Sequence, residues 1–151
     1  MTTQIRRYEE LTREELYAIL RLRVAVFVVE QQCAYMELDN LDQGALHIWM
    51  EDGDGIAAYL RVLDRGAESE DVSIGRVISV RRRQGLGSRI LAEGIKAARD
   101  RFGAERIYVE AQTYAKGLYE KQGFRQVSEE FLLDGIGHVK MILDIEEWKE
   151  P

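Results

Sequence analysis

The first part of the chain carries a strand pattern followed by a helix pattern. Residues 3–8 are typical of a short strand, and Thr12 with Glu15 three positions later forms the capping box that begins a helix. Apolar residues then recur at spacings of three and four, which predicts the core face of that helix: Leu16, Leu20, Val24 and Phe27. The segment 28–44 has no clean period, so we expect irregular structure or a short second helix there, beside a cleft.

Strand and helix patterns alternate along the remainder. Strand patterns cover 45–50, 56–63, 72–80, 106–111, 124–131 and 137–144, and helix patterns cover 85–102 and 114–122. The Asp-Gly-Asp-Gly turn at 52–55 predicts a hairpin between the first two of these strands. A strand, helix and strand in the middle of the chain favour a parallel pair. These patterns predict one α/β domain with a mixed sheet.

Composition narrows the class of protein. The chain has 151 residues, of which 46% are apolar, and 21 Lys and Arg against 27 Asp and Glu give a net charge of −6. This favours one compact domain and argues against nucleic acid as a partner. No apolar run approaches the roughly 20 residues of a membrane span, and no secretory signal is visible, so we expect a cytoplasmic protein without a membrane partner. Cys33 is the only cysteine, and the only histidines are His47 and His138, so we expect no disulfide and no metal.

A glycine-rich turn leads from strand 72–80 into the long helix. Its sequence is Arg82-Arg83-Gln84-Gly85-Leu86-Gly87-Ser88. The first turn of a helix presents unpaired N–H groups and the positive end of the helix dipole, and glycines let an anion approach closely. The turn therefore predicts a phosphate or diphosphate site, although the glycines could simply make a tight turn. A dinucleotide fingerprint would need a third glycine where Ile90 stands, and a P-loop would need a lysine before Ser88.

Two motifs resemble those of the GNAT superfamily of acyl-CoA-dependent N-acetyltransferases. The first is Arg/Gln-x-x-Gly-x-Gly/Ala, matched by Arg82, Gly85 and Gly87. The second lies at 112–124, where Tyr-Glu-Lys-x-Gly-Phe is matched and Gln112 replaces the usual asparagine. Three further stretches are similar to the ElaA-like branch of the superfamily: 23–31, 75–78 and 134–138. The resemblance implies a single GNAT domain over 1–151, with a mostly antiparallel sheet of about seven strands and helices on both faces.

The resemblance also implies acetyl-CoA as co-substrate. In the family, the strand before the turn pairs with the pantetheine arm and one of its N–H groups polarises the thioester carbonyl, a role that falls here to Ile78 or Ser79. The cofactor-binding residues implied are Ile78, Ser79, Val80, Arg82, Arg83, Gln84, Gly85, Leu86, Gly87, Ser88, Gln112 and Tyr119.

Roles in catalysis follow from the same resemblance and from the chemistry of amide formation. Tyr119 is the candidate general acid, since the family places this hydroxyl at the thioester sulfur; the alternative is a core tyrosine bonded to a backbone carbonyl. Glu30 and Glu110 are the candidate general bases. Arg76, in the middle of an apolar strand, must be paired or face a polar cleft. We expect it to orient Glu30 or to bind an acceptor carboxylate, in a substrate site that includes Phe27 and Glu30.

The function predicted is direct transfer of an acetyl group to a primary amine of a small molecule or peptide. Two alternatives stay open: a noncatalytic acyl-CoA-binding or sensing domain, and an acyltransferase resembling acyl-homoserine-lactone synthases, which Arg23-x-x-Val26-Phe27 distantly suggests. Cys33 is expected to be a small hydrophobe, and both histidines are expected to be hydrogen-bonded and half-buried rather than catalytic. A homodimer is compatible with the sequence, although no motif indicates one.

Overall fold

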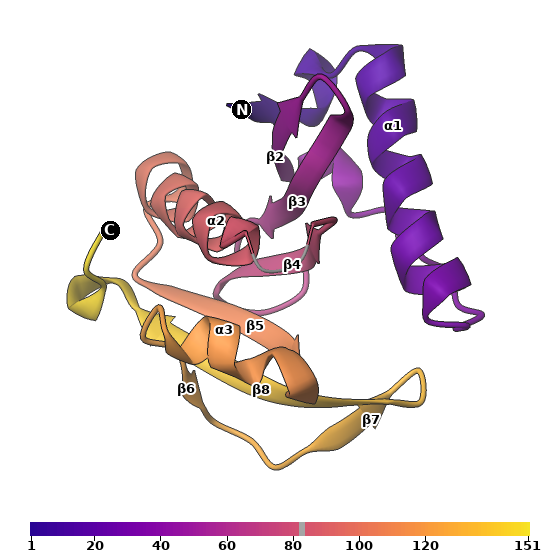
Figure 1. Ribbon diagram of the computed structural model, residues 1–151. Helices are drawn as coiled ribbons and strands as arrows, with labels where there is room; N and C mark the ends of the chain where they lie inside the picture. Colours follow the sequence, from indigo (N-terminus) through magenta and orange to yellow (C-terminus); the bar gives the residue numbers. More distant parts are fainter. Residues whose placement is uncertain (82–83) are drawn as a thin grey trace.

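The computed structural model describes residues 1–81 and 84–151, which form one sheet with helices on both faces (Figure 1). The strands are β1 (Thr2–Arg7), β2 (Leu46–Asp52), β3 (Gly55–Leu63), β4 (Val72–Ser79), β5 (Arg106–Gln112), β6 (Arg125–Gln126), β7 (Phe131–Leu133) and β8 (Ile136–Asp144). The helices are α1 (Arg13–Val24), which continues into the π-helical η2 (Ala25–Glu30), α2 (Leu86–Phe102) and α3 (Lys116–Glu120). Short 3-10 turns are η1 (Tyr8–Glu10), η3 (Asp42–Gly44), η4 (Thr113–Ala115) and η5 (Ile145–Glu147).

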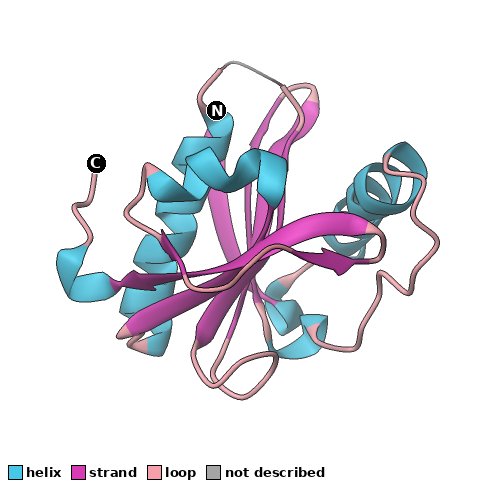
Figure 2. Ribbon diagram, turned by 90° about the horizontal axis from the view of Figure 1, so that it is seen from below, coloured by secondary structure: helices cyan, strands magenta, loops and turns pink. Residues whose placement is uncertain are grey.

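The sheet is antiparallel except at its centre. Its order is β1-β2-β3-β4-β5-β8-β6, and β7 also pairs with β8. The parallel pair β4–β5 is held at only two positions, Val72 with Ile107 and Ser73 with Tyr108. Beyond these positions the two strands separate, so the edge of β4 that faces β5 is left open up to Ser79. Figure 2 shows α1 and α2 on opposite sides of the sheet.

Two apolar clusters fill the space on the two sides. The larger lies between the sheet and α2, where Ile90, Leu91 and Ile95 are fully buried. The helix approaches closely because Gly94 has no side chain: a Cβ there would lie 2.8 Å from Leu60 Cδ2. The smaller cluster lies under α1 and consists of Ile19, Trp49, Tyr59 and Ile78. Each buried side chain of this size contributes about 2 kcal/mol to folding.

The predicted core face of α1 is wrong in part. The capping box of Thr12 and Glu15 is present, but Val24 is 37% exposed, and the buried residues of the helix are Ile19 and Arg23. The buried face of α1 includes the charged residue Arg23, so the spacing of apolar residues alone predicted the wrong face at this end of the helix. Arg23 can be buried because carboxylates from the following loop pair with it.

The strand predicted at 72–80 is present as β4, but a bulge interrupts the alternation of its side chains between the two faces. The pairing with β3 jumps from Arg61–Gly75 to Tyr59–Ile78, and Arg76 has a left-handed φ of 56°. The bulge makes β4 change faces: Ile74 packs in the larger cluster and Ile78 in the smaller.

Two C-terminal elements are shorter than expected. The strand expected at 124–131 is two pieces, β6 and β7, so the sheet has eight strands rather than about seven. Between the pieces the Ser128 hydroxyl accepts the Lys140 N–H at 2.9 Å, replacing a backbone partner. The helix expected at 114–122 is reduced to α3, preceded by η4.

Candidate active site

The N-terminus of α2 offers backbone N–H groups at the end of the open edge of β4. The first hydrogen bond of this helix runs from the Arg89 N–H to the Gly85 carbonyl, so the N–H groups of Leu86, Gly87 and Ser88 precede the helical ladder. No side chain in the described part of the chain caps them, and the first turn has no acidic residue. Gly85 has a left-handed φ of 69°, which glycine adopts without strain. This geometry fits a diphosphate.

The arginines of the turn play different parts. Arg81 binds Asp52 of the β2–β3 hairpin with an N–O distance of 2.6 Å, so its charge is already matched. Arg82 and Arg83, both expected to bind the cofactor, lie outside the described residues. Gln84 and Gly85 are exposed.

The open edge of β4 presents the backbone groups of Ser79, as the pairing of its neighbours shows. The Val80 N–H donates to the Ala57 carbonyl of β3 at 2.8 Å. Because hydrogen bonding alternates along an antiparallel strand, the backbone of Ile78 also faces β3, whereas that of Ser79 faces the open edge. Of the three residues expected to pair with a pantetheine arm, Ser79 therefore has its backbone groups on the correct side.

Tyr119 lies on the α2 side of the sheet, in the larger apolar cluster. Its ring is 7% exposed and meets Phe124 edge-on, with centroids 5.7 Å apart. The hydroxyl makes no hydrogen bond to any residue that the structure describes, and it is not one of the polar atoms sealed in the core without a partner. Burial raises the pKa of Tyr119 well above its usual value, which keeps the hydroxyl protonated. It is available as a hydrogen-bond donor.

The opposite side of the sheet carries a row of polar side chains, which we call the open face: Tyr108, Glu110, Gln112 and His138. The Tyr108 hydroxyl donates to Glu110 Oε1 at 2.9 Å. Burial, and then the negative charge of Glu110, raise the pKa of Glu68, although that residue keeps contact with solvent. Glu110 of the open face thus acts electrostatically on Glu68 of the β3–β4 loop, and a cation bound beside these carboxylates would stabilise their charged forms.

The segment after α1 closes one end of the open face. Gln112 Nε2 donates to Gln31 Oε1 at 3.3 Å, so this side chain reaches the segment instead of the α2 turn. Glu30 is exposed at the end of η2. Phe27 packs against the smaller apolar cluster, which includes Ile78 of β4.

A buried ionic network fixes the loop that leads from η2 to β2. Arg23 binds Glu37 through both carboxylate oxygens, at 2.5 and 2.9 Å, and binds Asp42 at 2.7 Å. Arg61 binds Asp42 at 2.9 Å and Asp39 at 2.5 Å. The sequence analysis missed this network; the available signal was a charged residue inside each of two apolar runs, at Arg23 and Arg61.

Arg76 completes the network. Its Nε lies 3.2 Å from Glu37 Oε1 and its Nη2 donates to the Glu37 carbonyl at 2.9 Å. The expectation that Arg76 orients Glu30 is wrong, because the bulge in β4 directs the guanidinium to the loop. Three arginines face three carboxylates, so the network is neutral.

The network also sets the protonation of its members. Burial tends to raise the pKa of Asp39, but the hydrogen bonds and charge of Arg61 outweigh it and lower the pKa to about 2. Burial also tends to raise the pKa of Asp42, but the hydrogen bonds and charges of Arg23 and Arg61 outweigh it, so the pKa is lowered. His47 bonds the Tyr59 hydroxyl at 2.7 Å and the Asp42 carbonyl at 2.9 Å, and burial lowers its pKa. These groups hold the loop in place.

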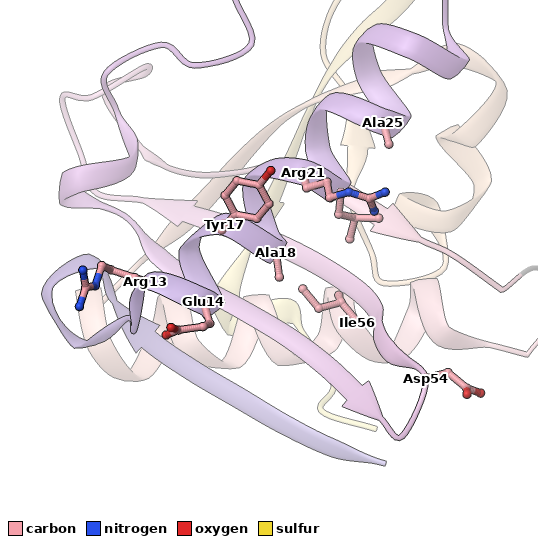
Figure 3. A pocket seen from close by; sticks show the side chains of 9 residues that line it. Arg13, Glu14, Tyr17, Ala18, Arg21, Ala25, Asp54 and Ile56 are labelled. Atoms are coloured by element: carbon pink, nitrogen blue, oxygen red, sulfur yellow. The ribbon is translucent and has the colours of Figure 1, made fainter.

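A groove of about 660 Å³ lies elsewhere, between α1 and the β2–β3 hairpin (Figure 3). Tyr17 and Arg21 of α1 and Ile56 of β3 line it. It adjoins neither the α2 N-terminus nor the open face, so we do not assign it to the site.

Comparison with known proteins identifies the family. Residues 8–145 match the Acetyltransferase (GNAT) domain. The chain belongs to the GNAT acetyltransferase family. ElaA of Escherichia coli is 34% identical over 142 residues, covering 91% of this chain and 93% of ElaA. A Mycobacterium tuberculosis protein of the UPF0039 group is 41% identical over 150 residues, covering 94% of each chain. The protein is therefore an ElaA-like GNAT acyltransferase.

Solved structures agree with the GNAT fold. An acyl-CoA N-acyltransferase from Pseudomonas aeruginosa is 36% identical with a TM-score of 0.86, covering 94% of this chain and 99% of that one. The E. coli ElaA structure is 33% identical with a TM-score of 0.87, covering 93% and 97%. The acyl-homoserine lactone synthase BjaI has a TM-score of 0.75 at 16% identity, which shows a shared fold alone.

Two further features concern metal ions and membranes. Within residues 1–81 and 84–151, no three His, Cys, Asp or Glu side chains are grouped so as to hold a metal ion. No helix in the described part of the chain is long and apolar enough to cross a membrane.

Proposed function

We propose that this GNAT protein transfers the acetyl group of acetyl-CoA directly to a primary amine of a small molecule or peptide. The observation that carries the proposal is the open edge of β4, which leads to the N-terminus of α2, where no described side chain caps the N–H groups. The N–H groups of Leu86, Gly87 and Ser88 would hold the diphosphate, and the backbone of Ser79 would meet the arm that carries the thioester.

The proton needed by the leaving sulfur has one candidate donor. Tyr119 has a protonated hydroxyl without a partner among the residues described. Its raised pKa makes complete proton transfer to a thiolate less favourable than for an ordinary phenol. Burial therefore favours a hydrogen bond to the sulfur as negative charge develops, with the proton following as the C–S bond breaks.

The charge of the open face favours a cationic acceptor. Burial and then the negative charge of Glu110 raise the pKa of Glu68, and a positive acceptor bound beside Glu68 would counter this effect. Glu30 and Glu110 stay candidate bases. Of the two, Glu110 is the more enclosed and is held by Tyr108.

An acceptor screen tests the proposal. Purified protein and acetyl-CoA would be incubated with spermidine, an aminoglycoside, a lysine-containing peptide and S-adenosylmethionine, and thiol release would be followed. We expect at least one of the first three amines to raise thiol release above acetyl-CoA hydrolysis. Binding of acetyl-CoA without turnover on any amine would contradict the proposal and favour a sensing domain. Turnover on S-adenosylmethionine alone would favour the lactone-synthase alternative.

A further inference from the structure

His138 lies on the face of β8 that is turned away from α2. Val139, Met141 and Leu143 belong to the larger apolar cluster, so strand alternation turns His138 and Lys140 to the open face. Lys140 is exposed there, whereas His138 is only 8% exposed. Neighbouring segments therefore enclose this histidine in particular.

The enclosure comes from the β7–β8 hairpin and from the segment after η2. The Phe131 ring of β7 lies against His138, with centroids 6.1 Å apart. Cys33 Sγ donates to the Asp134 carbonyl at 3.4 Å, so the segment after η2 meets the turn of the same hairpin. Gln112, the β5 partner of His138, bonds to that segment as well. His138 thus sits where three parts of the open face converge.

The hydrogen bonding of the ring fixes its tautomer. Nδ1 lies 2.7 Å from the Ile136 carbonyl oxygen, which can only accept, so Nδ1 carries the proton and donates. In the neutral ring Nε2 then holds a lone pair. Nε2 has no hydrogen-bond partner in the described part of the chain and is not among the buried polar atoms sealed from solvent. It is the atom of this ring that is ready to accept a proton.

His138 and Tyr119 lie on opposite sides of the sheet at the same end of β5. His138 pairs with Gln112, the last residue of β5, and faces the open side. The chain then passes through η4 to α3, which places Tyr119 in the cluster under α2. β5 lies between β4 and β8, so His138 is one strand away from the gap between β4 and β5. A thioester held in that gap would have the proton donor for its sulfur on the α2 side, and an acceptor amine lying on the open face would have His138 beside it.

We propose that His138 is the catalytic base of the acyl transfer, an inference that rests on the function proposed above. Nε2 takes one proton from the acceptor ammonium, and the freed lone pair forms the C–N bond as the C–S bond breaks. After the C–N bond forms, the nitrogen loses a second proton. That proton restores the Tyr119 hydroxyl, which has given its own proton to the sulfur. The imidazolium returns its proton to solvent. Glu110 then serves to attract the cation rather than to remove its proton.

Two substitutions separate this role from a structural one. His138→Asn keeps an amide N–H where Nδ1 stands, and so keeps the bond to Ile136, but it has no base at the Nε2 position. His138→Gln places an amide nitrogen near Nε2 and loses the bond to Ile136. Both variants would be assayed with the most active amine from the acceptor screen, beside Glu110→Gln and Glu30→Gln. Acetyl-CoA binding would be measured by calorimetry as a check on folding and on the cofactor site.

We expect both histidine variants to lose at least about 100-fold in kcat while acetyl-CoA affinity stays within about twofold of wild type. A third variant, His138→Ala, would be assayed with added imidazole, which should restore part of its rate; a purely structural role would not allow this rescue. An active His138→Asn variant would overturn the proposal, as would a larger kcat loss in Glu110→Gln or Glu30→Gln. If wild type turned over none of the amines, the proposed function would fail and the role of His138 with it; turnover by wild type and by His138→Asn would refute the role of His138 alone.

Discussion

At the scale of single residues, Tyr119 combines a buried ring with a hydroxyl that no described residue engages. The alternative expected from sequence, a hydroxyl bonded to a backbone carbonyl, is not seen in the described part of the chain. A tyrosine held only by its ring can direct its O–H to a ligand. This arrangement supports the proposed role of Tyr119 as a proton donor to the substrate.

We expect Tyr119→Phe to lower kcat at least about tenfold and to leave acetyl-CoA affinity unchanged, because the ring contacts remain and only the proton donor is lost. Tyr114→Phe is the matched control: Tyr114 lies five residues earlier and is 81% exposed, so its variant should retain wild-type kcat. Steady-state assays with calorimetry measure both effects. Equal kcat in wild type and Tyr119→Phe would remove the acid role.

Residues of the site differ in how far sequence could predict them. Gly85, Gly87 and Tyr119 belong to local motifs, so their places follow from neighbouring residues. Arg23 and Glu37 are 14 positions apart, and Arg76 and Glu37 are 39 apart, in a segment without periodicity. Which carboxylate meets which arginine depends on the packing of α1, β3 and β4 together, and local spacing holds no information on it.

At the scale of elements, the loop between η2 and β2 is held by charge rather than by apolar packing. Glu37 and Asp42 are almost fully buried, and their partners come from α1, β3 and β4. A loop held in this way keeps one position beside the open face. The network therefore fixes the position of this loop.

Breaking the network should cost far more than breaking a surface ion pair. Arg23→Met leaves Glu37 and Asp42 buried with fewer partners, and we expect unfolding free energy to fall by about 3 kcal/mol or more. The control is Arg7→Met, since Arg7 is exposed and pairs with Glu9 and Glu10 at the surface; its variant should match wild type. Urea unfolding measures both, and equal stability of the two variants would contradict the account.

Element boundaries show the same limit of local patterns. The hairpin of β2 and β3 and the span of α2 were predicted because turn residues and capping glycines mark them. The bulge in β4 and the division of strand 124–131 were not, because each results from pairing with a neighbouring strand. Arg76 at φ 56° is the clearest case: only the register against β3 requires it.

At the scale of the whole molecule, the free energy of unfolding should decrease in two steps as the pH is lowered from 7. The pKa of His47 is lowered by burial, so the unfolded chain binds a proton there first, and stability declines as pH falls below about 6.5. The pKa of Asp39 is about 2 and that of Asp42 is also lowered, so their contribution is complete above about pH 4 and is lost as pH falls toward 2.

For Asp39 alone this loss amounts to about 2 kcal/mol. Urea unfolding between pH 7 and 2.5 measures the profile, and Asp39→Asn should show a shallower decline below pH 4 than wild type does. A wild-type stability that stays constant or rises over that interval would contradict the assigned pairing of the carboxylates.

The account as a whole depends on the N-terminus of α2 binding the diphosphate of acetyl-CoA. Calorimetric titration with acetyl-CoA and with S-acetylpantetheine, which lacks the diphosphate, tests this directly. Two charge-assisted hydrogen bonds to backbone N–H groups correspond to about 100-fold in affinity, so we predict that the truncated donor binds at least about 100-fold more weakly. Equal affinity for the two donors, or no heat with acetyl-CoA, would contradict the account.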